Sequence, residues 1–275
     1  MRVPPDQRVR DRPELGAEIG VFGGSGFYDF LDDPVEVAVD TPFGPSAAPV
    51  LVGTLAGRRV AFLARHGRRH EFAAHRVPFR ANVWALASLG VRSIVGPCSV
   101  GALQRSLSIG DLVVVDQLVD RTHGRRADTY HDVGAGDGLP GADGPVHHQP
   151  FADPYDPGMR RALVDAAESL PDLRVHDGGT MVVINGPRFS TRAESRWFSS
   201  MGWDVVNMTG YPEAVLAAEA GVPYASVALV TDHDAGVAGA DDEQAPVTME
   251  AVMEVVADNV VAVQRLIEAV APTLP

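Results

Sequence analysis

The stretch that decides the fold reads Trp203-Asp-Val-Val-Asn-Met-Thr-Gly-Tyr-Pro-Glu-Ala214 and ends with Ala228-Leu-Val-Thr-Asp-His-Asp-Ala-Gly236. It predicts a strand, a helix and a second strand. Pro212 and Glu213 open the helix, because proline suits the first helical turn and an acid is stabilised near the positive end of a helix. The second strand, Tyr224 to Val230, is apolar enough to be buried, so the segment predicts part of an α/β sheet.

Polar residues follow both strands of this stretch. Asn207-Met208-Thr209 stand at the end of the first, and Asp232 and Asp234 stand at the end of the second. Ligands of open α/β sheets bind outside the carboxyl ends of the strands, so these residues are candidates for one site. The alternative is a solvated loop with an Asx turn, which explains most Asp-x-Asp pairs. The choice depends on the rest of the chain.

Composition narrows the class of protein. The chain has 275 residues, of which 45% are hydrophobic and 21% are charged, as in soluble globular proteins. Its formal net charge of -13 argues against nonspecific nucleic-acid binding and against an anionic membrane surface. That charge still permits an anionic small substrate held by a local basic cluster.

The single cysteine, Cys98, rules out an internal disulfide and fits a reducing compartment. The first residues lack the apolar core of a signal peptide, and no run approaches the roughly 18 apolar residues of a membrane span. We therefore expect a cytoplasmic protein. Residues 1–16 are rich in Arg, Pro and Asp and predict a disordered tail, followed by one domain over residues 17–275.

The domain alternates strands and helices, which predicts an α/β fold with a central, mostly parallel or mixed sheet flanked by helices. Residues 18–22 form its first strand, and residues 111–118 are β-branched and apolar enough to predict a central strand. Residues 121–158 are loop-rich and contain His148. A loop of that length in a compact domain is either disordered or functional.

Two further strand ends carry residues that suit an anion. Gly23-Gly24-Ser25-Gly26 lets the backbone approach an anion closely, although it matches neither a P-loop nor the dinucleotide fingerprint. Arg65-His66-Gly67-Arg68-Arg69-His70 is the densest basic cluster of the chain. A solvated loop and a zinc site are the alternatives, but no Cys or acid pair completes a zinc site around His66, His70 and His75.

Cys98-Ser99 follow the strand at residues 91–95, and Phe189-Ser190-Thr191 follow the strand at residues 180–184. Ser190 or Thr191 would cap the next helix, and Phe189 would either stack on a flat ring or pack in the core. Hydroxyls with one Arg and one His suit a phosphate. An aromatic ring and two carboxyls suit a nitrogenous base. Together these residues suggest transfer of a sugar between a base and phosphate.

A set of motifs in fixed order also carries a family resemblance. The motifs are Gly23-Gly24-Ser25-Gly26, Arg65-His66-Gly67-Arg68 with His70, Arg80-Ala81-Asn82, the segment from Gly186 to Glu194, Asn207-Met208-Thr209 with Pro212-Glu213, and Thr231-Asp232-His233-Asp234. In these motifs the chain resembles the methylthioadenosine phosphorylases, the trimeric branch of the purine nucleoside phosphorylases. The resemblance runs from about residue 18 to the C-terminal helix.

The resemblance implies a purine nucleoside phosphorylase-like fold and a role for each matching residue. The residues that would hold phosphate are Ser25, Arg65, His66, Ser99 and Thr209. The residues that would contact the nucleoside are Phe189, Ser190, Met208, Asp232 and Asp234, with His148 reaching the 5′ pocket of a neighbouring subunit in a homotrimer. Of these, Asp232, Asp234 and His66 would be catalytic.

The implied reaction is phosphorolysis of S-methyl-5′-thioadenosine to adenine and 5-methylthioribose 1-phosphate. Inorganic phosphate is then a co-substrate, and no metal or organic cofactor is required. Three alternatives stay open. Gly210-Tyr211 also resembles the branch that acts on 6-oxopurine nucleosides such as inosine, guanosine or methylthioinosine. The others are a nucleosidase that uses water and a purine-binding module without turnover.

Overall fold

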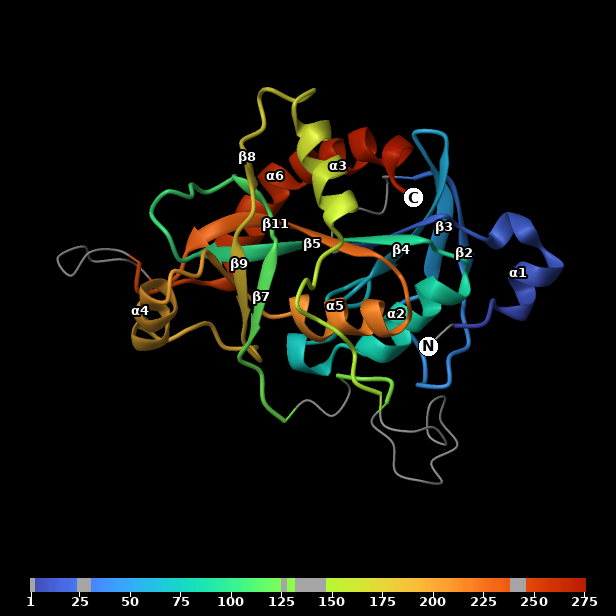
Figure 1. Ribbon diagram of the computed structural model, residues 1–275, viewed down its shortest axis with the longest axis horizontal. Helices are drawn as coiled ribbons and strands as arrows, with labels where there is room; N and C mark the ends of the chain where they lie inside the picture. Colours follow the sequence, from blue (N-terminus) through green and yellow to red (C-terminus); the bar gives the residue numbers. More distant parts are fainter. Residues whose placement is uncertain (1–2, 24–30, 125–127, 132–146, 238–245) are drawn as a thin grey trace.

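The computed structural model describes residues 3–23, 31–124, 128–131, 147–237 and 246–275. Through these residues runs one mixed sheet of eleven strands, with helices on both faces (Figure 1). The α/β fold class expected from the sequence is confirmed. None of the described helices is long and apolar enough to cross a membrane.

The strands are β1 Ile19–Gly23, β2 Asp32–Val37, β3 Val50–Leu55, β4 Arg58–Ala64, β5 Ser93–Ala102, β6 Leu112–Val114, β7 Gln117–Asp120, β8 Val175–Asp177, β9 Thr180–Val183, β10 Val205–Asn207 and β11 Tyr224–His233. The helices are α1 Gln7–Asp11, α2 Phe79–Ser88, α3 Pro157–Ala167, α4 Arg192–Ser200, α5 Gly210–Glu219 and α6 Met249–Val270. Short 3-10 helices are η1 Pro13–Leu15, η2 Ala74–Arg76 and η3 Ala271–Thr273.

Strand β5 is the branch point of the sheet. It runs parallel to β1 through residues 93–95 and parallel to β11 from Ile94 to Ala102. Where β1 has ended, the last two residues of β5 pair antiparallel with β10. The order β2-β3-β4-β1-β5-β10-β9-β7 therefore forms one path, and β11, β6 and β8 form a second path from the same strand.

Side-chain alternation along the strands builds a core on each face of the sheet. In β11, Ala225 and Val227 pack with the side chains of α3 and α6, whereas Ala228 and Val230 pack with those of α2 and α5. Figure 1 shows these two pairs of helices on opposite faces of the sheet. A strand buried on both faces needs a nearly continuous apolar run, and from Tyr224 to Val230 only Ser226 interrupts the run of β11.

The strand-helix-strand prediction for residues 203–236 is confirmed as β10, α5 and β11. The start of α4 also follows the sequence. Thr191 caps α4, accepting from the Glu194 N–H while the Glu194 side chain accepts from the Thr191 N–H. Thr248 caps α6 by accepting from the Ala251 N–H. Of the two candidates for the α4 cap, Thr191 is the one used.

Two strand boundaries differ from the prediction. Strands β5 and β11 extend past the polar residues expected at their ends, so Cys98, Ser99 and Asp232 lie within strands. The two strands hydrogen-bond to each other along their whole length, which keeps both extended, and a bulge lies between Val230 and Asp232. The single strand predicted over residues 111–118 is wrong, because β6 pairs with β11 and β8 whereas β7 pairs with β9.

The N-terminal segment also differs from the disordered tail predicted for residues 1–16. In its described part, α1 and η1 form, and Val3 and Leu15 are buried in the core beside α2. The Asp6 N–H donates to the Ser88 carbonyl at the end of that helix. These apolar contacts and this hydrogen bond tie the segment to the domain, which its average composition did not reveal.

Candidate active site

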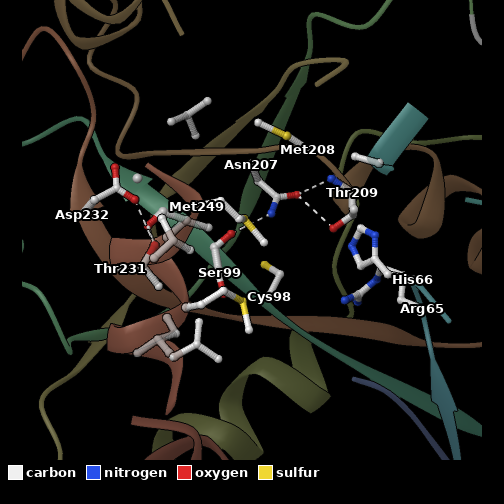
Figure 2. Close-up of a pocket in the computed structure, with 18 of the residues that line it drawn as sticks. Arg65, His66, Cys98, Ser99, Asn207, Met208, Thr209, Thr231, Asp232 and Met249 are labelled. Atoms are coloured by element: carbon white, nitrogen blue, oxygen red, sulfur yellow. Dashed lines mark hydrogen bonds between the residues drawn. The ribbon is translucent and has the colours of Figure 1, made fainter. Parts of the chain in front are cut away.

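A cavity of about 560 Å³ lies where β4, β5, β10 and β11 bring their polar residues together. Figure 2 shows Asp232 and Thr231 at one side of it and Arg65, His66 and Thr209 at the other, with β5 residues between them. One cavity therefore has an acidic end and an end rich in nitrogen and hydroxyl donors.

At the donor end, Arg65 follows the last residue of β4 and is almost fully buried. Its Nε and Nη2 donate to the two carboxylate oxygens of Glu213 at 2.6 and 2.7 Å, and Nη1 donates to the Pro97 carbonyl at 3.0 Å. Burial lowers the pKa of Arg65, but the charge and hydrogen bonds of Glu213 raise it above its ordinary value, so the side chain is charged. A guanidinium has five N–H groups, and described residues accept from only three of them.

The imidazole of His66 lies beside Arg65 (Figure 2) and stacks on His70, with ring centroids 4.3 Å apart. Burial lowers the pKa of His66 to about 4, against the raising effect of the Phe72 carbonyl and with a further lowering by Arg65 and His70. The ring is therefore neutral near pH 7. Its Nδ1 is 2.8 Å from the Phe72 carbonyl oxygen, so Nδ1 carries the proton and Nε2 is an acceptor.

Asn207 fixes the turn that carries Met208 and Thr209 into the cavity. Its Oδ1 accepts from the backbone N–H groups of Thr209 and Gly210, both at 2.6 Å. Its Nδ2 donates to the Ser99 carbonyl at 3.0 Å, which ties the start of α5 to β5. Asn207 therefore forms an Asx turn of its own, and this turn organises the donor end of the site.

At the acidic end, Asp232 accepts from the Thr231 hydroxyl at 2.9 Å. Burial raises the pKa of Asp232 to about 6, the Thr231 hydrogen bond opposes this shift, and the charge of Asp234 adds to it. Burial also raises the pKa of Asp234, against hydrogen bonds from Ser195 and Ser190. The pair can therefore hold a proton at a pH at which an exposed aspartate has lost it.

A glycine of β5 allows both acids to lie close against this strand. A Cβ at Gly101 would lie 3.0 Å from an oxygen of Asp232 and 3.3 Å from the Cβ of Asp234. Phe189 and Ser190 come from the turn before α4 and also line the cavity. Phe189 is only partly buried and does not belong to the hydrophobic core, which favours the stacking role over the packing role.

Most of the residues predicted for the site do meet. Those that line the cavity are Arg65, His66, Ser99, Phe189, Ser190, Met208, Thr209, Asp232 and Asp234. Ser25 lies outside the described residues. His148 is exposed and does not line this cavity in the described part of its own chain. Its expected role therefore requires a second subunit.

Sequence reasoning missed one complete wall of the cavity. One face of α6 supplies an apolar surface, made of Met249, Val252, Met253, Val256, Val260 and Val263. These positions recur at helical spacing, which from the sequence alone reads as ordinary core packing. Cys98 also lines the cavity, and burial raises the pKa of its thiol to about 11, so the thiol is neutral. Its place in β5 became clear only from the length of that strand.

Comparison with known proteins places the chain among nucleoside phosphorylases. A model of the phosphorylase superfamily matches residues 18–272. The chain is 59% identical over 220 residues to the S-methyl-5′-thioadenosine phosphorylase of Mycolicibacterium smegmatis, covering 80% of this chain and 78% of that protein. It is 51% identical over 250 residues to the purine nucleoside phosphorylase of Streptomyces coelicolor, covering 90% of this chain and 85% of that one.

Among solved structures, methylthioadenosine phosphorylase from Schistosoma mansoni in complex with adenine matches this chain with a TM-score of 0.84. The sequence identity is 37%, and the match covers 94% of this chain and 92% of the other. The similarity therefore extends over the sheet, both helical layers and the segments that form the cavity.

The raised pKa of Asp232 predicts a stability gain in Asp232→Asn. An acid whose pKa is higher in the folded protein contributes stability that is present below its unfolded pKa, near 3.8, and is lost as the pH rises through about 6. Asparagine cannot ionise, so we expect the variant to be more stable than the wild type by about 1–2 kcal/mol at pH 8, with no such gain at pH 4. Urea unfolding at both pH values measures this difference.

The exposed Asp153 gives the control, because Asp153→Asn removes a carboxylate that is not desolvated. We expect its effect on the free energy of unfolding to be small at both pH values. Equal effects of Asp232→Asn at pH 4 and pH 8 would contradict the assignment of a raised pKa to this carboxyl.

Proposed function

Because the chain belongs to the phosphorylase superfamily, we propose that it catalyses phosphorolysis of S-methyl-5′-thioadenosine to adenine and 5-methylthioribose 1-phosphate. The observation that carries the proposal is the polarity of the cavity, with Arg65, His66 and Thr209 at one side and Asp232 at the other (Figure 2); Asp234 also lines it. Relatives named S-methyl-5′-thioadenosine phosphorylase support the choice of substrate.

In the proposed reaction, phosphate binds at the donor end. Arg65 directs its remaining N–H groups at two phosphate oxygens, and the hydroxyls of Thr209, Ser99 and Ser25 donate to the others. Because Nε2 of His66 is an acceptor, it takes a hydrogen bond from a protonated phosphate oxygen. Met208 lies against the ribosyl ring. The bound anion stabilises the positive charge that develops on this ring.

At the other end, the purine stacks on Phe189 and its N7 edge faces the acids. As the C1′–N9 bond breaks, protonated Asp232 gives its proton to N7, and a phosphate oxygen forms the new bond to C1′. Ionised Asp234, with Ser190, accepts from the 6-amino group. Neutral adenine leaves and the sugar retains the phosphate, so the step balances without a metal or an organic cofactor.

The α6 wall favours a 5′-methylthio substituent. It presents only methionine and valine side chains to the cavity, among them Met253 and Val256. A methylthio group buries apolar surface there, whereas the 5′-hydroxyl of adenosine would need a hydrogen-bond partner. This wall is the physical reason to expect methylthioadenosine ahead of adenosine.

A 6-oxopurine nucleoside phosphorylase is the second candidate, favoured by the similarity to the Streptomyces coelicolor purine nucleoside phosphorylase. The Asp232–Asp234 pair disfavours a 6-oxopurine substrate. O6 and N7 of a 6-oxopurine are both acceptors, so an ionised carboxylate would repel O6. A hydrolase has less support, because it would leave the two N–H groups of Arg65 that Glu213 and Pro97 do not use without an anion to bind. We further propose a cytoplasmic enzyme that acts on small molecules, with the single cysteine as support.

Turnover should require inorganic phosphate. With methylthioadenosine as substrate, we expect adenine release only when phosphate is present, together with formation of methylthioribose 1-phosphate. Arg65→Lys keeps the charge but loses the planar guanidinium, whose N–H groups donate to Glu213 and phosphate at the same time. The KM for phosphate should therefore rise about tenfold or more. Arg92→Lys, which alters a surface pair with Glu18, is the control and should leave this KM unchanged. Full activity in phosphate-free buffer would favour hydrolysis instead.

Base selection should depend on Asp232. Asp232→Asn removes the proton donor to N7, so kcat/KM for methylthioadenosine should fall about 10²-fold or more. The amide can donate to O6 or N7, so the reaction of inosine should be unchanged or improved. Measuring kcat/KM for both substrates in wild type and variant tests this. A wild type that prefers inosine, or an equal effect on both substrates, would show that the acids have been misassigned.

The active unit should be a homotrimer in which His148 completes the 5′ pocket of a neighbour. Light scattering should give three chains per particle, and His148→Ala should raise the KM for methylthioadenosine more than that for phosphate. The adjacent His147→Ala, which loses contacts to His131 and Gln149, serves as the control. A fully active monomer would exclude this role.

A further inference from the structure

Behind the donor end of the cavity lies a buried chain of hydrogen bonds that the reaction itself does not use. Glu213 of α5 receives Arg65 on both carboxylate oxygens, and the hydroxyl of Tyr224 in β11 donates to its Oε1 at 2.7 Å. Arg65, Glu213 and Tyr224 are 4%, 1% and 3% exposed. The three side chains come from three elements, so the packing of the sheet on α5 fixes where the guanidinium points.

The space for this chain of hydrogen bonds depends on a glycine in β5. A Cβ at Gly96 would lie 2.0 Å from the Tyr224 hydroxyl oxygen and 2.9 Å from Oε1 of Glu213. The ring of Tyr224 also stacks on Tyr155, with centroids 6.1 Å apart and an angle of 28° between the planes. Gly96 is therefore the residue that leaves room for the Tyr224 hydroxyl beside Glu213.

The bidentate contact determines which donors of Arg65 are left for a ligand. Glu213 takes Nε–H and one N–H of Nη2, and the Pro97 carbonyl takes one N–H of Nη1. Among the described residues, each terminal nitrogen therefore keeps one N–H without an acceptor, and two such groups can donate to two oxygens of a tetrahedral oxyanion. A guanidinium that rotated about its long side chain would lose this match, and burial without a partner would be costly.

We propose that Glu213 and Tyr224 are positioning residues for phosphate, which hold the guanidinium of Arg65 in the orientation that presents its last two N–H groups to the oxyanion. This inference rests on the proposed phosphorolysis and adds to it the residues that set its phosphate affinity. Glu213 also balances the charge of Arg65, so the anion is recognised by directed hydrogen bonds instead of by a net positive charge.

Tyr224→Phe tests the proposal with the smallest change. It removes only the hydroxyl that fixes Glu213, and we expect the KM for phosphate to rise about tenfold while the KM for methylthioadenosine changes less than twofold. Tyr155→Phe is the matched control, because Tyr155 is equally buried and stacks on the same ring, but its hydroxyl contacts Met181 and not Glu213. A general loss of packing would affect both variants alike, as thermal unfolding would show.

Variants of two further residues, Gly96 and Glu213, test the same hydrogen bonds. Gly96→Ala should displace the Tyr224 hydroxyl and reproduce the phosphate defect of Tyr224→Phe. Glu213→Asp keeps the charge but shortens the side chain, so its KM for phosphate should lie between the wild type and Glu213→Gln. If Glu213→Gln does not fold, the tyrosine and glycine variants still decide the question.

The outcomes separate this proposal from the proposed function. Phosphate-dependent wild-type turnover with the same KM for phosphate in Tyr224→Phe and Tyr155→Phe would overturn the positioning role alone. Phosphate-independent turnover in the wild type would overturn the proposed function. In that case, calorimetric titration with inorganic phosphate tests the positioning role directly. Weaker phosphate binding by Tyr224→Phe than by Tyr155→Phe supports this role, and equal binding refutes it.

Discussion

The parallel pairing of β5 with β11 is the constraint on which the rest of the structure depends. It joins Ile94 to Tyr224 at one end and Ala102 to His233 at the other, so residues far apart in sequence share one register. Along its other edge, β5 pairs first with β1 and then with β10. The same strand therefore aligns the strand ends that supply both halves of the cavity. A shift of one residue would turn every side chain of β11 to the opposite face of the sheet.

The sequence predicted the parts of this structure that depend on local chemistry. Pro212 and Glu213 near the start of α5, and the Thr191 cap of α4, are short-range signals, and both occur where expected. Most of the residues that the resemblance assigns to the site line one cavity, and their individual roles stay predictions. Boundaries that depend on distant pairing were not predictable, as the extension of β5 to Ala102 against β11 shows.

Dependence on distant contacts also explains why the roles of Glu213 and Tyr224 were not predictable from the sequence. Glu213 looks like a helix-starting acid in the sequence, and it is one, yet its carboxylate is also the partner of Arg65, 148 positions earlier in the chain. Tyr224 looks like the first residue of a buried strand, and only the absence of a Cβ at Gly96 admits its hydroxyl. Long-range polar contacts leave no periodic pattern, so they become visible only in three dimensions.

A buried ion pair of this kind needs a reason other than stability. Desolvating Arg65 and Glu213 costs about as much as their attraction returns, and an apolar pair of similar volume would often serve the fold equally well. In a chain of net charge -13, the overall charge does not attract an anion to the site. The donor end is also close to electrically neutral, since Glu213 balances Arg65 and His66 is uncharged near pH 7. Recognition must then come from oriented donors, and orientation is what a buried, doubly hydrogen-bonded guanidinium provides.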